Sequence, residues 1–132
     1  MFGKKQQPSI KSLIAQGTCI EGNLKFADGL RIDGEVKGNI SATEGSASIL
    51  VISESALVSG SIHADHVIIN GRVVGPVHAS ELLELQPKAK IEGDVSYKAL
   101  EMHQGAVIFG QLRPTSQEIE EKPILKLAAN NI

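Results

Sequence analysis

The sequence predicts an all-β protein, a single-domain β-helix of about six windings. Two observations support this prediction. A five-residue glycine motif (apolar, any residue, Gly, any residue, apolar) recurs six times, with starts about 15 to 22 residues apart. A shorter apolar motif (apolar, any residue, apolar) precedes five of these six copies. Similarity at a nearly fixed step is typical of repeat proteins in which each repeat is one supersecondary unit.

The glycine motif indicates where the core of the predicted β-helix lies. Alternate side chains of a strand share a face, so the two apolar residues and the glycine between them should point inward. The intervening residues are mostly polar, as in Glu21, Asn23, Lys37 and Asn39, and should point outward. The predicted core repeat consists of Ile20, Gly22, Leu24, Val36, Gly38, Ile40, Val58, Gly60, Ile62, Val73, Gly75, Val77, Ile91, Gly93, Val95 and Gly110.

Turns connect the two motifs within each coil. Asp33-Gly34 and Asn70-Gly71 are strong signals for short turns. Longer connections occur at residues 53–57, 86–90 and 103–107. One circuit per roughly 16 residues describes a coil of a β-solenoid. We expect this domain to span residues 13–113, with an incomplete first coil and a loop at residues 42–48.

Composition agrees with this fold. Of 132 residues, 42% are hydrophobic but only 3% are aromatic, so Ile, Leu and Val would fill a narrow interior. A small or aromatic residue two positions past five of the glycine motifs should also point inward: Phe26, Ala42, Ala64, Ala79 and Tyr97. The net charge of −2 gives no electrostatic footprint for nucleic acid. The single cysteine, Cys19, excludes an internal disulfide framework and fits a reducing compartment.

Both ends of the chain depart from the repeat pattern and are predicted to be disordered tails. Pro114 should end the repeats, because proline cannot donate to a further ladder. Residues 114–132 form the predicted C-terminal tail, with a short helix at 124–130 as the alternative. We find no segment long enough to span a membrane and no signal peptide.

The N-terminal tail, residues 1–12, carries a predicted membrane-targeting tip formed by Met1, Phe2, Lys4 and Lys5. Burying the Phe2 ring in a membrane is worth about 2 kcal/mol, and each lysine near anionic headgroups about 1 kcal/mol. These energies would hold one chain loosely. They would hold linked chains firmly, because linked anchors bind by avidity.

Candidate residues for chemistry do not form a recognisable site. His63 and His78 occupy equivalent positions in adjacent coils and should stack on the outer face. A zinc site needs three or four converging ligands, and neither a cysteine nor an acid shares their row. Glu81 and Glu84 are interpreted as residues of a solvated face. We therefore predict no catalytic, cofactor-binding or metal-binding residues, and no enzymatic activity.

The N-terminal tip, the six glycine motifs in register, the Asp-Gly and Asn-Gly turns and the proline that ends the repeats resemble the bactofilins, bacterial cytoskeletal proteins. The resemblance implies a right-handed β-helix that assembles end to end, without nucleotide, into non-polar filaments. It also places such filaments in the cytoplasm, peripherally on the inner face of the cytoplasmic membrane. There they would act as scaffolds for cell-shape and envelope or peptidoglycan-synthesis proteins.

The ends of a solenoid suggest the same assembly on physical grounds. Both ends leave strand edges unpaired and expose a slice of the core, and no amphipathic capping helix is evident in the sequence. The expected interface residues are Phe109, Ile108, Leu112, Leu13 and Ile14. Phe109 is the only aromatic residue at the second position of a glycine motif, in the last coil, where a neighbouring subunit would stack. Alternatively, its ring folds over its own coil or lies under the tail.

Two other classes of function remain open. A hexapeptide-repeat acyltransferase has an apolar residue every six positions, but this step from Ile20 reaches Gly38 and Glu44, so the register fails in the second coil. A monomeric β-helical binding module, such as an adhesin, would need export, for which we find no signal.

Overall fold

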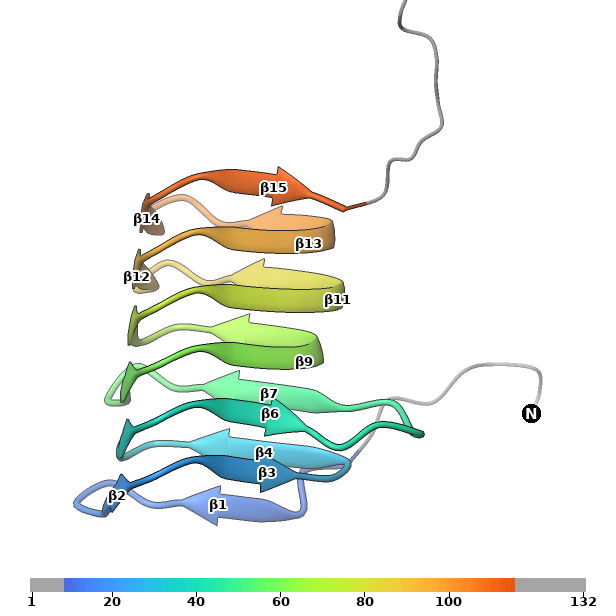
Figure 1. The fold of residues 1–132 in the computed structure, drawn as a ribbon. Coiled ribbons are helices and arrows are strands. Elements are labelled where there is room, and N and C mark those ends of the chain that lie inside the picture. Colours follow the sequence, from blue (N-terminus) through green and yellow to red (C-terminus); the bar gives the residue numbers. More distant parts are fainter. Residues whose placement is uncertain (1–8, 116–132) are drawn as a thin grey trace, which may run out of the picture.

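The computed structural model describes residues 9–115 and shows the chain rising in parallel strands, coil upon coil (Figure 1). The first coils contain β1 (Ser12–Ile14), β2 (Cys19–Glu21), β3 (Leu24–Phe26), β4 (Gly29–Ile32), β5 (Glu35–Lys37), β6 (Ile40–Ala42) and β7 (Ile49–Ile52). The middle and last coils contain β8 (Leu57–Ser59), β9 (Ile62–Ile69), β10 (Arg72–Val74), β11 (Val77–Leu85), β12 (Lys90–Glu92), β13 (Val95–Met102), β14 (Val107–Phe109) and β15 (Leu112–Pro114). The predicted all-β solenoid of about six windings is confirmed.

Two sheets form the sides of the solenoid. One is six-stranded, in the order β14-β12-β10-β8-β5-β2, and the other is nine-stranded and contains the remaining strands. All pairings are parallel, and equivalent residues of successive coils lie opposite one another, as in Val36↔Val58 and Val58↔Val73. Each coil therefore repeats the side-chain pattern of the coil beneath it.

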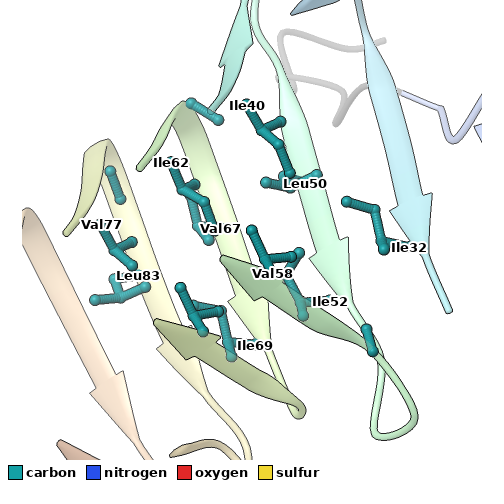
Figure 2. Packing of buried hydrophobic residues seen from close by; sticks show 14 of the residues in the cluster. Ile32, Ile40, Leu50, Ile52, Val58, Ile62, Val67, Ile69, Val77 and Leu83 are labelled. Carbon is teal, nitrogen blue, oxygen red and sulfur yellow. The ribbon is translucent and has the colours of Figure 1, made fainter. Parts of the chain in front are cut away.

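Stacked aliphatic side chains fill the interior. Figure 2 shows Ile40, Ile62 and Val77 in one row and Leu50, Val67 in another, each row following the coils. Most of these side chains are completely shielded from solvent. The small or aromatic residues past the glycine motifs also pack inward: Phe26, Ala64, Ala79 and Tyr97 are buried, and Ala42 packs against the core while partly exposed.

The glycine motif differs from the prediction in one respect, because it is a corner between two strands and not a single strand. β5 ends at Lys37 and β6 begins at Ile40, with Gly38 between them at φ 155°. A left-handed backbone torsion turns the chain there, so both apolar residues of the motif still point inward while the glycine does not continue the alternation. The prediction that alternation runs through the glycine was wrong.

The incomplete first coil and the loop at residues 42–48 lie where they were expected. Residues 15–18 form a turn in which the amide of Thr18 donates to the carbonyl oxygen of Ala15. The amide of Ala106 donates to the carbonyl oxygen of His103 in the same way in the last coil. At the loop, the amide of Thr43 donates to the carbonyl oxygen of Phe26. The strands begin and end one residue outside the predicted 13–113 domain, since Ser12 and Pro114 both lie in paired strands.

Candidate assembly surfaces

Open strand edges lie at both ends of the solenoid. Within residues 9–115, β1, β2 and β3 pair only with the coil above them. At the other end, β14 and β15 pair only with the coil below. Unpaired backbone N–H and C=O groups at such edges can pair with another chain.

The C-terminal end also exposes apolar side chains. Phe109 is 62% exposed, and Leu112 and Met102 are each 46% exposed. Their equivalents one coil below are Glu92, Val95 and Leu85, of which the two aliphatic residues are 0% exposed. The exposure of Leu112 and Met102 therefore results from the absence of a covering coil within the described residues.

The predicted interface residues of this end take two orientations. Ile108 lies in register with Ile91, points inward and is half-buried against the core. Phe109 lies in register with Glu92, on the outward row that also contains Val74. Because 62% of Phe109 is exposed, the described residues leave its ring largely uncovered.

The N-terminal end also exposes apolar side chains. Leu13 is 57% exposed, and its register partner Arg31 shows that it points outward. Ile14, the next residue, pairs with Ile32 and is buried in the core. Ile20 is partly exposed, whereas Val36 directly above it is completely shielded. The structure thus places Leu13 on the rim of this end and Ile14 beneath its surface.

A ladder of polar side chains along the outer corner was not predicted from the sequence. The amide of Asn39 donates to Oδ1 of Asn23 at 3.0 Å, and the amide of Ser61 donates to Oδ1 of Asn39 at 3.0 Å. In the coil beneath the last one, Asp94 replaces asparagine and accepts the amide of Gln111 from the last coil at 2.9 Å. The fourth position of the glycine motif, where all these residues lie, is the signal that could have revealed the ladder.

Asp94 has an altered pKa as a result of this contact. The hydrogen bond from the Gln111 amide and the hydrogen bond from the Arg113 guanidinium, 3.3 Å away, lower its pKa below the ordinary value near 3.8. Both contacts favour the charged carboxylate. Asp94 therefore connects the last coil to the one beneath it.

The histidines stack as predicted. His63 and His78 are register partners, and their ring centroids lie 5.4 Å apart. Nδ1 of His78 and Oγ of Ser96 are 2.6 Å apart, within hydrogen-bonding distance. Asp65, two residues after His63, accepts hydrogen bonds from the Ser48 amide and the Ser80 hydroxyl, so its carboxylate holds the 42–48 loop.

Other candidate positions add no further site. Across residues 9–115, no group of three or more His, Cys, Asp or Glu side chains could hold a metal ion. Cys19 is exposed. Within the same range, no helix is long and apolar enough to cross a membrane. The predicted membrane-targeting residues Met1, Phe2, Lys4 and Lys5 lie outside the described residues.

Comparison with known proteins assigns the chain to a family. Residues 12–113 match the family model for bactofilin, described as polymer-forming cytoskeletal. The chain is 29% identical to bactofilin BacO of Myxococcus xanthus (strain DK1622) over 111 residues, which cover 84% of this chain and 85% of that relative. It is 24% identical to bactofilin BacP of the same organism over 101 residues, which cover 76% of this chain and 40% of BacP. No solved structure is significantly similar. The match over nearly the whole solenoid shows that this chain belongs to the bactofilin family.

Proposed function

We propose that this bactofilin assembles end to end into filaments without a nucleotide, and that these filaments serve as a scaffold on the inner face of the cytoplasmic membrane. One observation carries the proposal. The stacked core is closed along its sides, but exposed apolar residues and unpaired strand edges meet at its two ends within residues 9–115.

The C-terminal end supplies the stronger contact. Fully burying an exposed Phe or Leu side chain is worth about 1.5–3 kcal/mol. Covering the exposed part of Phe109 or Leu112 therefore stabilises a joint by up to this amount on each side. A joint between two identical ends uses each residue twice by symmetry. Alternating joints of like ends produce a non-polar filament, with Phe109, Ile108 and Leu112 at one joint and Leu13 and Ile14 at the other.

Membrane attachment would come from the N-terminal tip. Phe2 would enter the lipid surface while Lys4 and Lys5 meet anionic headgroups. A filament carries many such tips, and their combined binding exceeds that of a single chain by avidity. Assembly therefore strengthens membrane binding in this account.

The scaffold would position proteins of cell shape and envelope or peptidoglycan synthesis along the membrane. The long, regular sides of a stacked solenoid offer the same side chains at every subunit, which suits repeated attachment of a client. The role is structural, and we propose no catalytic activity.

The proposal is tested with purified full-length protein dialysed against EDTA in nucleotide-free buffer. Negative-stain electron microscopy and sedimentation should show filaments, and adding ATP, GTP or Mg²⁺ should not change their amount. Filaments that appear only after a nucleotide or a divalent ion is added would contradict the proposal.

A further inference from the structure

β13 is longer than the strand that covers it. Its residues Val95–Tyr97 pair with β15, but residues 99–102 pair only with β11 within the described part of the chain. In a parallel ladder, alternate residues direct their backbone groups to opposite sides. The His103 amide donates to the Leu85 carbonyl oxygen in the coil below. Leu100 and Met102 lie an odd number of residues from His103, so their backbone N–H and C=O groups point to the opposite, uncovered side.

The side chains on this edge are also incompletely covered. Leu100 is half-buried against the core, and Met102 is 46% exposed. Glu101, between them, points outward in register with Glu84, and two like charges opposite each other are unfavourable. Within residues 9–115, no ion pair offsets the charge of Glu101.

The chain beyond the solenoid contains a segment that matches this edge. Residues 124–127 read Ile-Leu-Lys-Leu, the pattern of residues 49–52 (Ile-Leu-Val-Ile) and 99–102 (Ala-Leu-Glu-Met). Laid in parallel over β13, this segment brings Leu125 onto Leu100 and Leu127 onto Met102. It also brings Lys126 beside Glu101, where opposite charges on neighbouring strands attract.

The connection to this segment has a precedent lower in the solenoid. The Thr115 amide donates to the Tyr97 carbonyl oxygen at 2.8 Å, as the Thr43 amide donates to the Phe26 carbonyl oxygen at 2.8 Å. Thr43 opens the 42–48 loop, which bridges β6 and β7 at the same corner. A somewhat longer connection from Thr115 is accessible, because the entropy of loop closure rises only slowly with length.

We propose that residues 124–127 of each chain dock on the open edge of β13, at residues 99–102, as the first strand of a seventh coil. The docked strand covers Leu100 and Met102 beside the exposed Phe109 and Leu112. It therefore competes with a second subunit for the C-terminal end. This consequence for assembly rests on the proposed function, whereas the docking itself does not.

Cysteine cross-linking tests the docking. In a Cys19→Ser background, Glu101→Cys and Lys126→Cys would lie as register neighbours, within the Cα separation that a disulfide requires. Under mild oxidation this pair should form an intramolecular disulfide at least about tenfold faster than Glu21→Cys with Lys126→Cys, because docking raises the effective concentration. Glu21 is an equally outward-facing residue at the opposite end of the solenoid.

A second variant tests specificity, and isotope-labelled chains identify the partner. Leu125→Asp and Leu127→Asp are added to the protein with Glu101→Cys and Lys126→Cys. The rate of disulfide formation should then fall to the rate measured for Glu21→Cys with Lys126→Cys. Equal rates for the two cysteine pairs without these aspartates would overturn the proposal. In a mixture of labelled and unlabelled chains, disulfides between chains link the two kinds. If the disulfide forms only between chains, docking occurs on a second copy and the proposal is also overturned.

The effect on assembly is measured separately as a critical concentration. If the docked state holds more than half of the chains, Leu125→Asp with Leu127→Asp should lower the critical concentration by at least about twofold. An unchanged value with the intramolecular disulfide present would refute competition while leaving docking supported. Filaments absent from every variant and from the unmodified protein would refute the proposed function, not the docking.

Discussion

The backbone of Gly60 packs directly over the carbonyl oxygen of Gly38, and a Cβ atom at Gly60 would overlap that oxygen. The same contact recurs up the corner at Gly75 and Gly93. Gly60 also has φ 154°, a torsion that residues with side chains rarely adopt. This glycine therefore meets two requirements at once, the turn and the close stacking of coils.

Replacing Gly60 with alanine should destabilise the solenoid strongly. The unfavourable torsion alone costs about 1–3 kcal/mol, and the overlap with Gly38 adds to it. Gly22→Ala is the matched control, since Gly22 has φ 133° at the same motif position but no atom within 4 Å of its Cβ site. Thermal unfolding by circular dichroism should show a clearly larger loss for Gly60→Ala. Equal losses of thermal stability in the two variants would mean that the stacking of coils does not require a glycine at position 60.

These glycines show what could be predicted from the sequence and what could not. The inward rows were predictable, because apolar residues recur in register and only a solenoid aligns such rows. The corner was not, because a period of two residues describes side-chain direction and not the backbone torsion at Gly38. The exposed position of Phe109 followed from its place in the glycine motif, whereas the open edge at residues 99–102 depends on where β15 ends.

Ser48 should prove important for the 42–48 loop. It is almost fully buried, its hydroxyl accepts the Asp65 amide at 3.0 Å, and its own amide donates to the Asp65 carboxylate at 3.1 Å. Ser48→Ala leaves the Asp65 amide without this acceptor, which should cost about 1–3 kcal/mol. Ser46→Ala, at an exposed position of the same loop, should have little effect. Urea unfolding measures the stability of both variants, and hydrogen exchange measures the protection of the Asp65 amide. Equal protection of this amide in Ser48→Ala and Ser46→Ala would rule out its hydrogen bond to the Ser48 hydroxyl.

Asp94 should make stability depend on pH in the acidic range. Because its pKa is lowered in the folded state, its contribution is present above the ordinary carboxyl pKa and is lost as pH falls through the lowered value. Asp94→Asn keeps an oxygen that can accept the Gln111 amide, as Asn23 and Asn39 do in lower coils. The urea midpoint of the unmodified protein should therefore fall relative to Asp94→Asn below about pH 4. Parallel pH profiles of the two proteins would contradict this role.

Removal of the N-terminal tip should separate membrane binding from assembly. Deletion of residues 1–5, or Phe2→Glu, removes the apolar anchor and should leave filaments that no longer sediment with vesicles containing anionic lipid. Lys11→Gln is a control, since Lys11 lies nearer the solenoid and pairs with Asp28. Co-sedimentation of the deletion variant at the level of the unmodified protein would show that the tip is not the anchor.

Phe109 provides the most direct test of end-to-end assembly. Phe109→Arg would bring two charges together at a joint of like ends, and burying unpaired charge costs far more than losing an apolar contact. Val74→Arg is the matched control, because Val74 lies on the same outward row in the middle of the solenoid. Light scattering after size-exclusion chromatography, with circular dichroism to verify folding, should show β-rich monomers or dimers for Phe109→Arg and filaments for Val74→Arg. Long filaments formed by Phe109→Arg would contradict the account.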